Sequence, residues 1–335
     1  MKNFIDKYYR TIAKAALITI YLVIIAGAVV RMTGSGMGCP DWPKCFGYYI
    51  PPTEASQLEF KPNHDYKKGI VIIKNEALLV AKTDFTSSNS LNTEHWEAYT
   101  KHDYAIYNPL HTWVEYINRL FGALSGIPTL LLAIFSFWFW RKSKWITILA
   151  VINLFCLAFQ AWLGKTVVDS NLAPYKITIH MVMALVIVAI ILYLIFASKT
   201  RFKTQIQDKT FRNVLLFGII LTLIQVVIGT QVRQFVDEQV KTIGYVKEQW
   251  LINPTLQFYI HRSFSILVFA LNAWLFYRNR KLNLGFKKIN LVMACIVLEV
   301  FTGIAMYYFD FPFLSQPLHL VIATILFGIQ FYVYL

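Results

Sequence analysis

Four histidines stand at or just inside one end of long apolar stretches, and imidazole is the side chain that most often ligates a transition metal. They are His111, His180, His261 and His319. An ionisable group inside a membrane is costly unless it is satisfied, so such residues are usually functional. Two helices of a bundle can each present one histidine to opposite sides of a haem iron, and these positions therefore predict haem ligation. A simple hydrogen bond to a neighbouring helix is the alternative.

The histidines form one complete pair and one incomplete pair. His261 and His319 lie in the sixth and eighth apolar stretches at one depth, which predicts a bis-histidine site. His180 lies in the fourth stretch, but its partner position in the second stretch is Asn118, and asparagine is a poor iron ligand. His111 precedes Asn118 by seven residues on the same helix face, about 10 Å toward the outer side, and is a further candidate ligand.

One acid and four arginines accompany the histidines. Glu115 lies three residues before Asn118 on the same helix face, and it is the candidate catalytic carboxylate. A plain bond from Glu115 to His111 or Arg119 is the alternative. The arginines lie near the outer edge, where they are expected either to pair with haem propionates or to reach toward lipid headgroups. They are Arg31, Arg119, Arg233 and Arg262.

The four cysteines divide by location. Cys39 and Cys45 lie in a polar segment on the outer side, where an oxidising compartment favours a disulfide between them. Cys156 and Cys295 lie within apolar stretches and are expected to be packing residues.

Eight apolar stretches must position these residues. The chain has 335 residues, 57% hydrophobic and 15% charged, and the low charged share excludes a soluble enzyme, which carries about 25%. Stretches of about 20 apolar residues span a bilayer as helices. The net charge of +14 resides in the loops that flank the stretches, so no nucleic-acid partner is expected. The stretches are roughly 13–30, 113–138, 145–164, 175–197, 213–232, 257–277, 289–308 and 316–335.

The loops predict the orientation and one large outer segment. Lys and Arg concentrate before the first stretch and after the second, fourth and sixth, which predicts cytoplasmic termini of a multi-pass inner-membrane protein. Residues 32–110 then form a long extracytoplasmic loop that is expected to cap the outer surface. Within it, residues 69–81 predict a β-hairpin and residues 93–104 a short helix.

The sequence also repeats itself in the same order along the two halves. His180 and His319 are 139 residues apart, as are Gly164 and Gly303. The matching segments are Gly27-Ala-Val-Val-Arg31 with Gly229-Thr-Gln-Val-Arg233, and Gln160-Ala-Trp-Leu-Gly164 with Glu299-Val-Phe-Thr-Gly303. This favours an all-α integral membrane protein of two pseudo-symmetric four-helix bundles, a tandem parallel repeat with units at 1–200 and 201–335.

With these features, the chain resembles the haem A synthase family over nearly its whole length. The resemblance is carried by Arg31-Met-Thr-Gly-Ser-Gly36, the cysteine pair around Trp42-Pro43, Glu115-Tyr116-x-x-Arg119 and the histidines of the fourth, sixth and eighth stretches. It implies oxidation of the C8 methyl of haem O to the formyl of haem A, with haem b in the C-terminal bundle and the substrate haem in the N-terminal one. His261 and His319 match the haem b ligands, His180 one N-terminal histidine and Glu115 the family's acidic residue.

The chain departs from the family pattern at Asn118, where the family has a histidine, and it lacks the second-half cysteine pair of some members. The implied partners are haem O synthase (a protohaem farnesyltransferase), cytochrome oxidase assembly and an unidentified electron acceptor, with homo-oligomerisation left open. Two other functions stay open: a dihaem b-type membrane cytochrome that transfers electrons, and a haem-binding transporter or assembly factor.

Overall fold

The computed structural model describes residues 2–99, 107–170, 172–199, 206 and 208–335. Within these residues, eight helices are long and apolar enough to cross a membrane, which confirms the expected all-α integral membrane protein. They are α1 (Lys2–Met32), α2 (Pro109–Ser136), α3 (Lys144–Asp169), α4 (Pro174–Ala197), α5 (Lys209–Ile243), α6 (Leu256–Lys281), α7 (Ile289–Tyr308) and α8 (Ser315–Tyr334).

Local sequence explains where two of these helices begin. The side chain of Asn108 accepts the backbone N–H groups of Leu110 and His111, and Pro109 occupies the first helical position. Asp208 caps α5 in the same way by accepting the N–H of Phe211. Helix α5 has 35 residues, far more than the roughly 20 that a bilayer needs, so one end extends beyond the apolar stretch.

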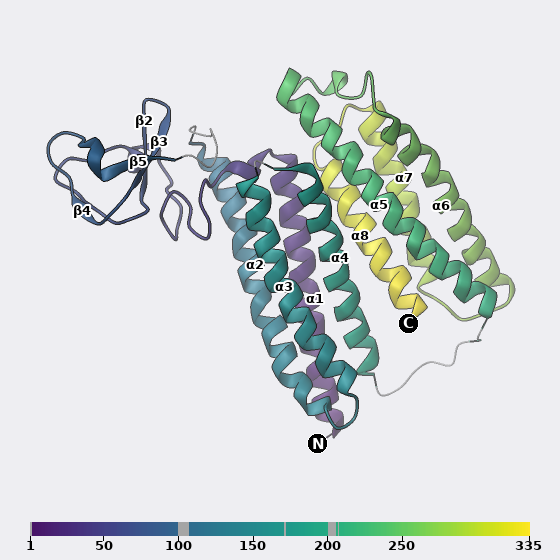
Figure 1. Ribbon diagram of the computed structural model, residues 1–335. Helices are drawn as coiled ribbons and strands as arrows, with labels where there is room; N and C mark the ends of the chain where they lie inside the picture. The colour runs from purple at the N-terminus through teal and green to yellow at the C-terminus, as the bar shows by residue number, and fades with distance from the viewer. Residues whose placement is uncertain (1, 100–106, 171, 200–205, 207) are drawn as a thin grey trace.

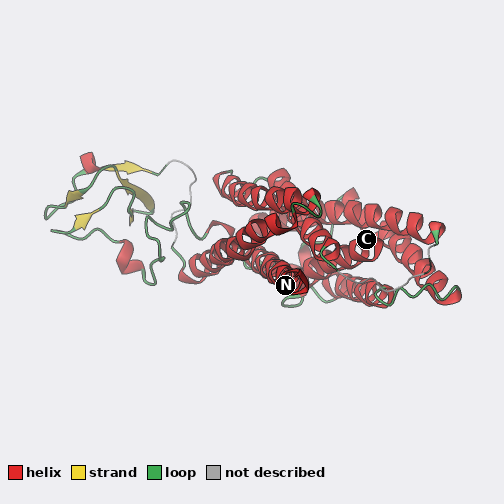
Figure 2. Cartoon of the chain, turned by 90° about the horizontal axis from the view of Figure 1, so that it is seen from below, coloured by secondary structure: helices red, strands yellow, loops and turns green. Residues whose placement is uncertain are grey.

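The helices form two sets, α1–α4 (the first set) and α5–α8 (the second set), and in each set successive helices pack side by side and the fourth returns to the first. Figure 2 shows the two sets from below, with the helices seen closer to end-on. Helices α4 and α8 also contact each other, and α1 contacts α8, so the two sets share an interface. In such a ring the second and fourth helices stand diagonally across the interior.

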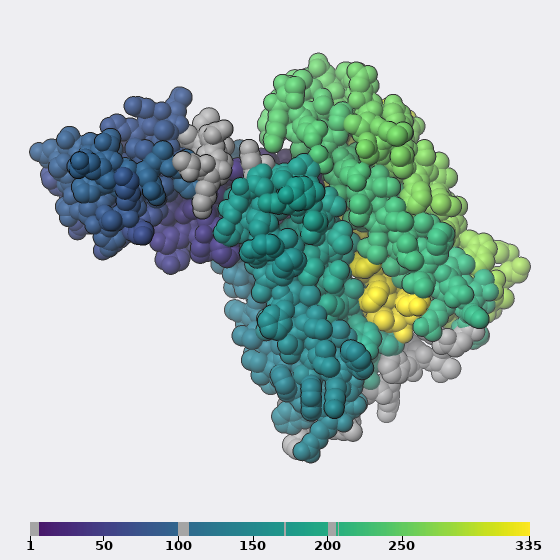
Figure 3. Space-filling model, in the orientation of Figure 1, coloured from purple at the N-terminus to yellow at the C-terminus, as the bar shows by residue number. Residues whose placement is uncertain are grey.

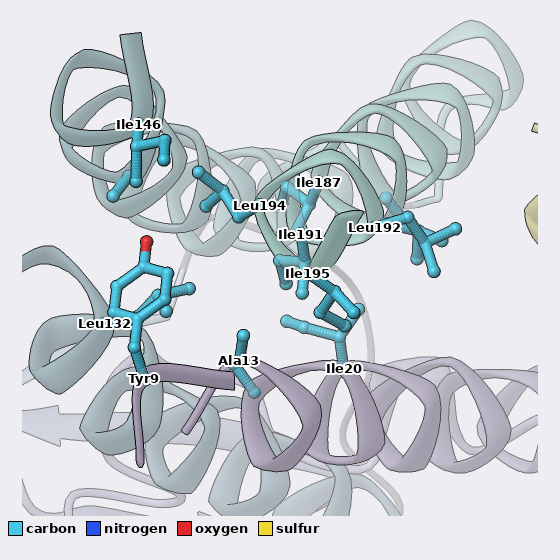
Figure 4. Packing of buried hydrophobic residues seen from close by; sticks show 14 of the residues in the cluster. Tyr9, Ala13, Ile20, Leu132, Ile146, Ile187, Ile191, Leu192, Leu194 and Ile195 are labelled. Atoms are coloured by element: carbon cyan, nitrogen blue, oxygen red, sulfur yellow. The ribbon is translucent and has the colours of Figure 1, made fainter. Parts of the chain in front are cut away.

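Buried aliphatic side chains fix how the first set packs. Ala13 and Ile20 of α1 face Ile191 and Ile195 of α4 (Figure 4). Burial of each large aliphatic side chain contributes about 1.5–3 kcal/mol in water, but in lipid close packing rather than water exclusion selects the partner. This packing sets the rotation of each helix and therefore the direction of its polar side chains.

The described part of the segment between α1 and α2 contains five short strands. Strands β2 (Val71–Lys74) and β3 (Ala77–Ala81) are antiparallel, with Lys74 opposite Ala77, which confirms the predicted hairpin. Asn75 and Glu76 between them have φ of 51° and 61°, as a tight two-residue turn requires. The other strands are β1 (Asp65–Tyr66), β4 (Phe85–Thr86) and β5 (Trp96–Ala98).

Two expectations for this segment need correction. Of the helix expected at 93–104, only Thr93–His95 form a single 3-10 turn, and β5 follows and pairs with β3, while residues 100–106 lie outside the described residues. Burial of Trp96 against other aromatic rings explains why pairing wins over local helix formation. The segment also extends sideways from one end of the first set (Figures 1 and 3), so it does not cap the second set.

Candidate functional site

Each odd-numbered helix places one glycine against a polar side chain of the next helix. A Cβ added to Gly229 would lie 3.0 Å from the ring of His261, so any larger residue would crowd that ring. The same relation recurs in all four helix pairs, with closest approaches from 3.0 to 3.8 Å. The pairs are Gly27 with Asn118, Gly164 with His180, Gly229 with His261 and Gly303 with His319. Small residues let helices approach closely, and here each glycine leaves room for the histidine or asparagine of the next helix.

The structure brings His261 and His319 together across the interior of the second set. Their ring centroids are 6.3 Å apart and their planes are inclined by 70°. Imidazole nitrogens bind metals at about 2 Å, so two imidazoles that share one metal have centroids about 6 Å apart. The pair therefore has the separation that a single haem iron between them requires.

Groups on α7 orient the ring of His319, and a group on α5 contacts the backbone of His261. Nδ1 of His319 lies 2.8 Å from Thr302 Oγ1 and 2.9 Å from Glu299 Oε2. A partner at Nδ1 leaves Nε2 for a metal, which is the usual arrangement around ligating histidines. Gln225 donates from Nε2 to the carbonyl of His261 at 2.7 Å. Sequence reasoning missed Thr302 and Gln225, although a polar residue four positions before the glycine, as in Gln225 and Glu299, was a usable signal.

The second set also contains buried polar atoms that fit an additional group. Nδ1 of His261, Oε1 of Gln225 and Oε1 of Glu299 have no hydrogen-bond partner among the described residues. A buried polar atom without a partner is costly, so such a cluster is typical of a site completed by a ligand. A haem is compatible with these donors and acceptors.

The first set repeats the arrangement around His180. Gln160 donates from Nε2 to the carbonyl of His180 at 3.0 Å, as Gln225 does to His261. Nδ1 of His180 and Oδ1 of Asn118 are buried and lack a partner in the part of the chain that the structure describes. Asn118 lies against Gly27 in the same way as His261 lies against Gly229. Asn118 and His261 are 143 residues apart in the sequence, so they occupy matching positions of the two sets.

His111 lies in the first turn of α2, against the segment that follows α1. Its Nδ1 is 2.9 Å from Ser35 Oγ, and Ser35 is in turn 2.6 Å from Thr33 Oγ1. The backbone of Gly38 packs on this turn so closely that a Cβ there would lie 2.4 Å from the carbonyl oxygen of His111. The structure thus places His111 with the outer segment, about 10 Å along the helix from Asn118.

Glu115 and Arg119 bind the same outer segment. Glu115 is 3% exposed, and its Oε2 accepts the backbone N–H of Cys39 at 2.9 Å. Its Oε1 accepts from Nε and Nη2 of Arg119 at 3.1 and 2.5 Å. Nη1 of Arg119 donates to the carbonyls of Asp41 and Lys44 at 2.6 and 2.9 Å. The guanidinium of Arg119 is therefore occupied by Glu115 and by loop carbonyls.

The loop held by this pair contains the predicted disulfide, which is present between Cys39 and Cys45. Both cysteines are buried. Asp41 accepts the N–H groups of Phe46 and Gly47 at 2.6 and 2.9 Å, and burial raises the pKa of its carboxyl group. The loop is thus closed by a covalent bond, by Asp41 and by the groups of α2. Cys156 and Cys295 are free cysteines, and both pack against buried apolar clusters, as expected.

The other arginines lie apart from Arg119. Arg31 donates to Asp237 Oδ2 at 3.0 and 2.8 Å, and Arg233 pairs with Asp237 Oδ1 at 2.8 Å. Two cations from α1 and α5 therefore share one anion at the interface of the sets, and Nη1 of Arg233 has no partner among described residues. Asp237 was missed because it lies beyond the predicted fifth stretch. Arg262 is exposed over the ring of Tyr307 at 5.5 Å.

Comparison with known proteins gives a consistent family match. Residues 10–77 and 86–331 match the COX15-CtaA family model, described as cytochrome oxidase assembly protein. The "Heme A synthase" of Wolbachia sp. subsp. Brugia malayi (strain TRS) is 25% identical, over 93% of this chain and 91% of that protein. The "Heme A synthase" of Rickettsia africae (strain ESF-5) is 23% identical, over 95% and 94%. The protein of that name from Wolbachia pipientis wMel is 23% identical, over 94% and 88%.

Proposed function

The chain belongs to the COX15-CtaA family of cytochrome oxidase assembly proteins, and we propose that it is a haem A synthase. In this role it is an oxidoreductase that converts the C8 methyl group of haem O to the formyl group of haem A. The observation that carries the proposal is the pair of half-buried imidazoles at 6.3 Å in a chain that matches this family over most of its length. The names of its relatives support the same activity.

We assign the two haems to the two sets of helices. Haem b would be held between His261 and His319 in the unit 201–335, and the orphaned polar atoms around that pair support this assignment. The substrate haem would occupy the unit 1–200 with His180 as its ligand. A bound haem supplies an iron that can change its oxidation state. The protein side chains would bind and orient the haem.

Glu115 is the proposed catalytic carboxylate of the first unit. Oxidation of a methyl group to a formyl group releases protons, and a carboxylate within reach can accept one. Glu115 lies three residues from Asn118, on the helix that contributes to the proposed substrate site. Its contacts with Arg119 and Cys39 also tie the disulfide loop to that helix, which would close the outer end of the site against water.

The remaining proposals concern the arginines, the membrane location and the partners of the protein. Arg31, Arg233 and Arg262 are proposed to face haem propionates at the outer edge, and Nη1 of Arg233 is the buried donor available for this among the described residues. Arg119 is proposed to act through the loop instead. We place the protein in the cytoplasmic membrane with both termini inside and residues 32–110 outside. Haem O synthase and an electron acceptor are its proposed partners.

The test is the reaction itself. The chain is expressed in cells that make haem O but no haem A, and extracted haems are separated by chromatography. Haem A should appear, and it should be lost in His180→Ala while the low-spin spectrum of the second unit is retained. A protein that binds haem with unchanged spectra but never yields haem A would instead be an electron-transferring dihaem cytochrome or a haem carrier.

A further inference from the structure

One of the four equivalent positions beside the glycines differs in chemistry. Three of them hold a histidine, whereas the fourth, on α2, holds Asn118. Helices α2 and α4 have the same diagonal relation in the first set as α6 and α8 have in the second set. Asn118 therefore occupies the place from which His261 faces its partner.

The residues around Asn118 also differ from those around the three histidines. The three histidines each have a polar residue from the preceding helix, four positions before the glycine. These residues are Gln160 and Gln225, which donate to the backbone carbonyls of His180 and His261, and Glu299, which pairs with Nδ1 of His319. The matching position before Gly27 is Val23, whose side chain has no polar group for either kind of contact. The position of Asn118 therefore lacks the polar contact from the preceding helix that all three histidine positions share.

The side chain of Asn118 is shorter than that of histidine. Its Oδ1 is buried and has no hydrogen-bond partner among the described residues. An amide is a poor iron ligand but has both a donor and an acceptor for hydrogen bonds. The other candidate on this helix, His111, is about 10 Å away along the axis and is bonded to Ser35. Among the described residues, nothing brings a second imidazole to the side opposite His180.

We infer that the first set forms a one-histidine haem site, in which His180 is the sole protein ligand and Asn118 faces the opposite coordination position. That position is left open to a small exogenous ligand such as water or carbon monoxide, and the amide of Asn118 is its hydrogen-bonding partner. The inference rests on the proposed function, because it needs a haem in the first set. It makes Asn118 the residue that distinguishes a reactive site from a closed, electron-transferring one.

The experiment uses the full chain in detergent, titrated with haemin until both sites are filled. In the reduced wild type, carbon monoxide should bind half of the haem, and the other half should stay low-spin. Asn118→His should abolish carbon monoxide binding and convert all haem to the low-spin form. The reciprocal variant His261→Asn should open the second site, so that carbon monoxide binds all of the haem. Asn118→Ala should still bind carbon monoxide, but with a shifted C–O stretching frequency, because the amide no longer contacts the ligand.

Two results would overturn the inference. One is a wild-type protein whose two haems are both low-spin and do not bind carbon monoxide. In that case, carbon monoxide binding by His111→Ala would identify His111 as the second ligand. The other is failure of the first set to bind haem under titration. Both readouts are independent of turnover. If carbon monoxide binds as expected but haem A is never formed, the proposed function fails while the one-histidine site stands.

Discussion

Replacing Glu115 by alanine should release the disulfide loop from α2. The carboxylate accepts three hydrogen bonds, one from the backbone of Cys39 and two from Arg119. Alanine removes all three and leaves the guanidinium of Arg119, whose side chain is 14% exposed, without its counter-charge. The covalent Cys39–Cys45 bridge remains, so the loop keeps its own closure but loses its attachment to the helix.

The size of the effect follows from the burial of the pair. Removing one partner of a buried, hydrogen-bonded ion pair costs about 3–5 kcal/mol. Since about 1.4 kcal/mol is a factor of ten, the opening equilibrium of the loop should shift by roughly 100-fold to several thousand-fold. The protection of backbone amides reports this equilibrium directly, because amides exchange from the open state.

Hydrogen exchange followed by mass spectrometry on a peptide covering residues 38–48 is the assay. Exchange in Glu115→Ala should be faster by that factor, up to the limit set by the remaining contacts. Glu59→Ala is the matched control, because Glu59 is an exposed carboxylate in the same segment and its loss should leave exchange unchanged. Wild-type protection of the peptide in Glu115→Ala would refute the anchoring role.

Two further variants separate anchoring from catalysis. Arg119→Gln loosens the loop but keeps the carboxylate, whereas Glu115→Gln keeps the shape of the side chain and removes its charge. If the carboxylate acts in the chemistry, Glu115→Gln should lose haem A formation and retain haem b. Retained haem A formation in Arg119→Gln, with rapid loop exchange, would show that anchoring alone is dispensable. Full activity in Glu115→Gln would end the catalytic assignment.

Three other predictions address the rest of the molecule. Asp237→Asn should lower the free energy of unfolding by about 1.5–3 kcal/mol, because the arginines of α1 and α5 lose their shared anion. An unchanged unfolding temperature would contradict this prediction. The Arg278 side chain lowers the pKa of Asp208 in the folded protein. The ion pair of Asp208 with Arg278 should therefore stabilise the fold fully above the unfolded pKa of about 3.9, and this stabilisation should be lost as the pH falls through the lower folded pKa. Unfolding of Asp208→Asn and wild type should therefore differ at neutral pH and converge in acid. His261→Ala or His319→Ala should each abolish the low-spin haem signal, and a surviving bis-histidine spectrum would exclude the pair.

Local patterns determined the membrane architecture and the identity of the histidines. Stretch length and apolar content predict each spanning helix, since both are properties of contiguous residues. The hairpin at residues 69–81 was predictable for the same reason. The expected helix at residues 93–104 failed because pairing of β5 with β3, which joins distant residues, outweighs local preference.

The i,i+4 pair of Glu115 and Arg119 was anticipated from spacing, but tertiary structure decided the long-range contacts of the charged residues. Glu115 and Cys39 are 76 residues apart, and Arg31 and Asp237 are 206 apart, so no local pattern encodes either contact. The rotation of each helix is set by packing against its neighbours, and that rotation places each glycine beside its polar partner. The sequence by itself therefore determined which groups are available inside the membrane. Their pairing was decided by packing, because a buried charge is stable only next to the partner that the fold brings to it.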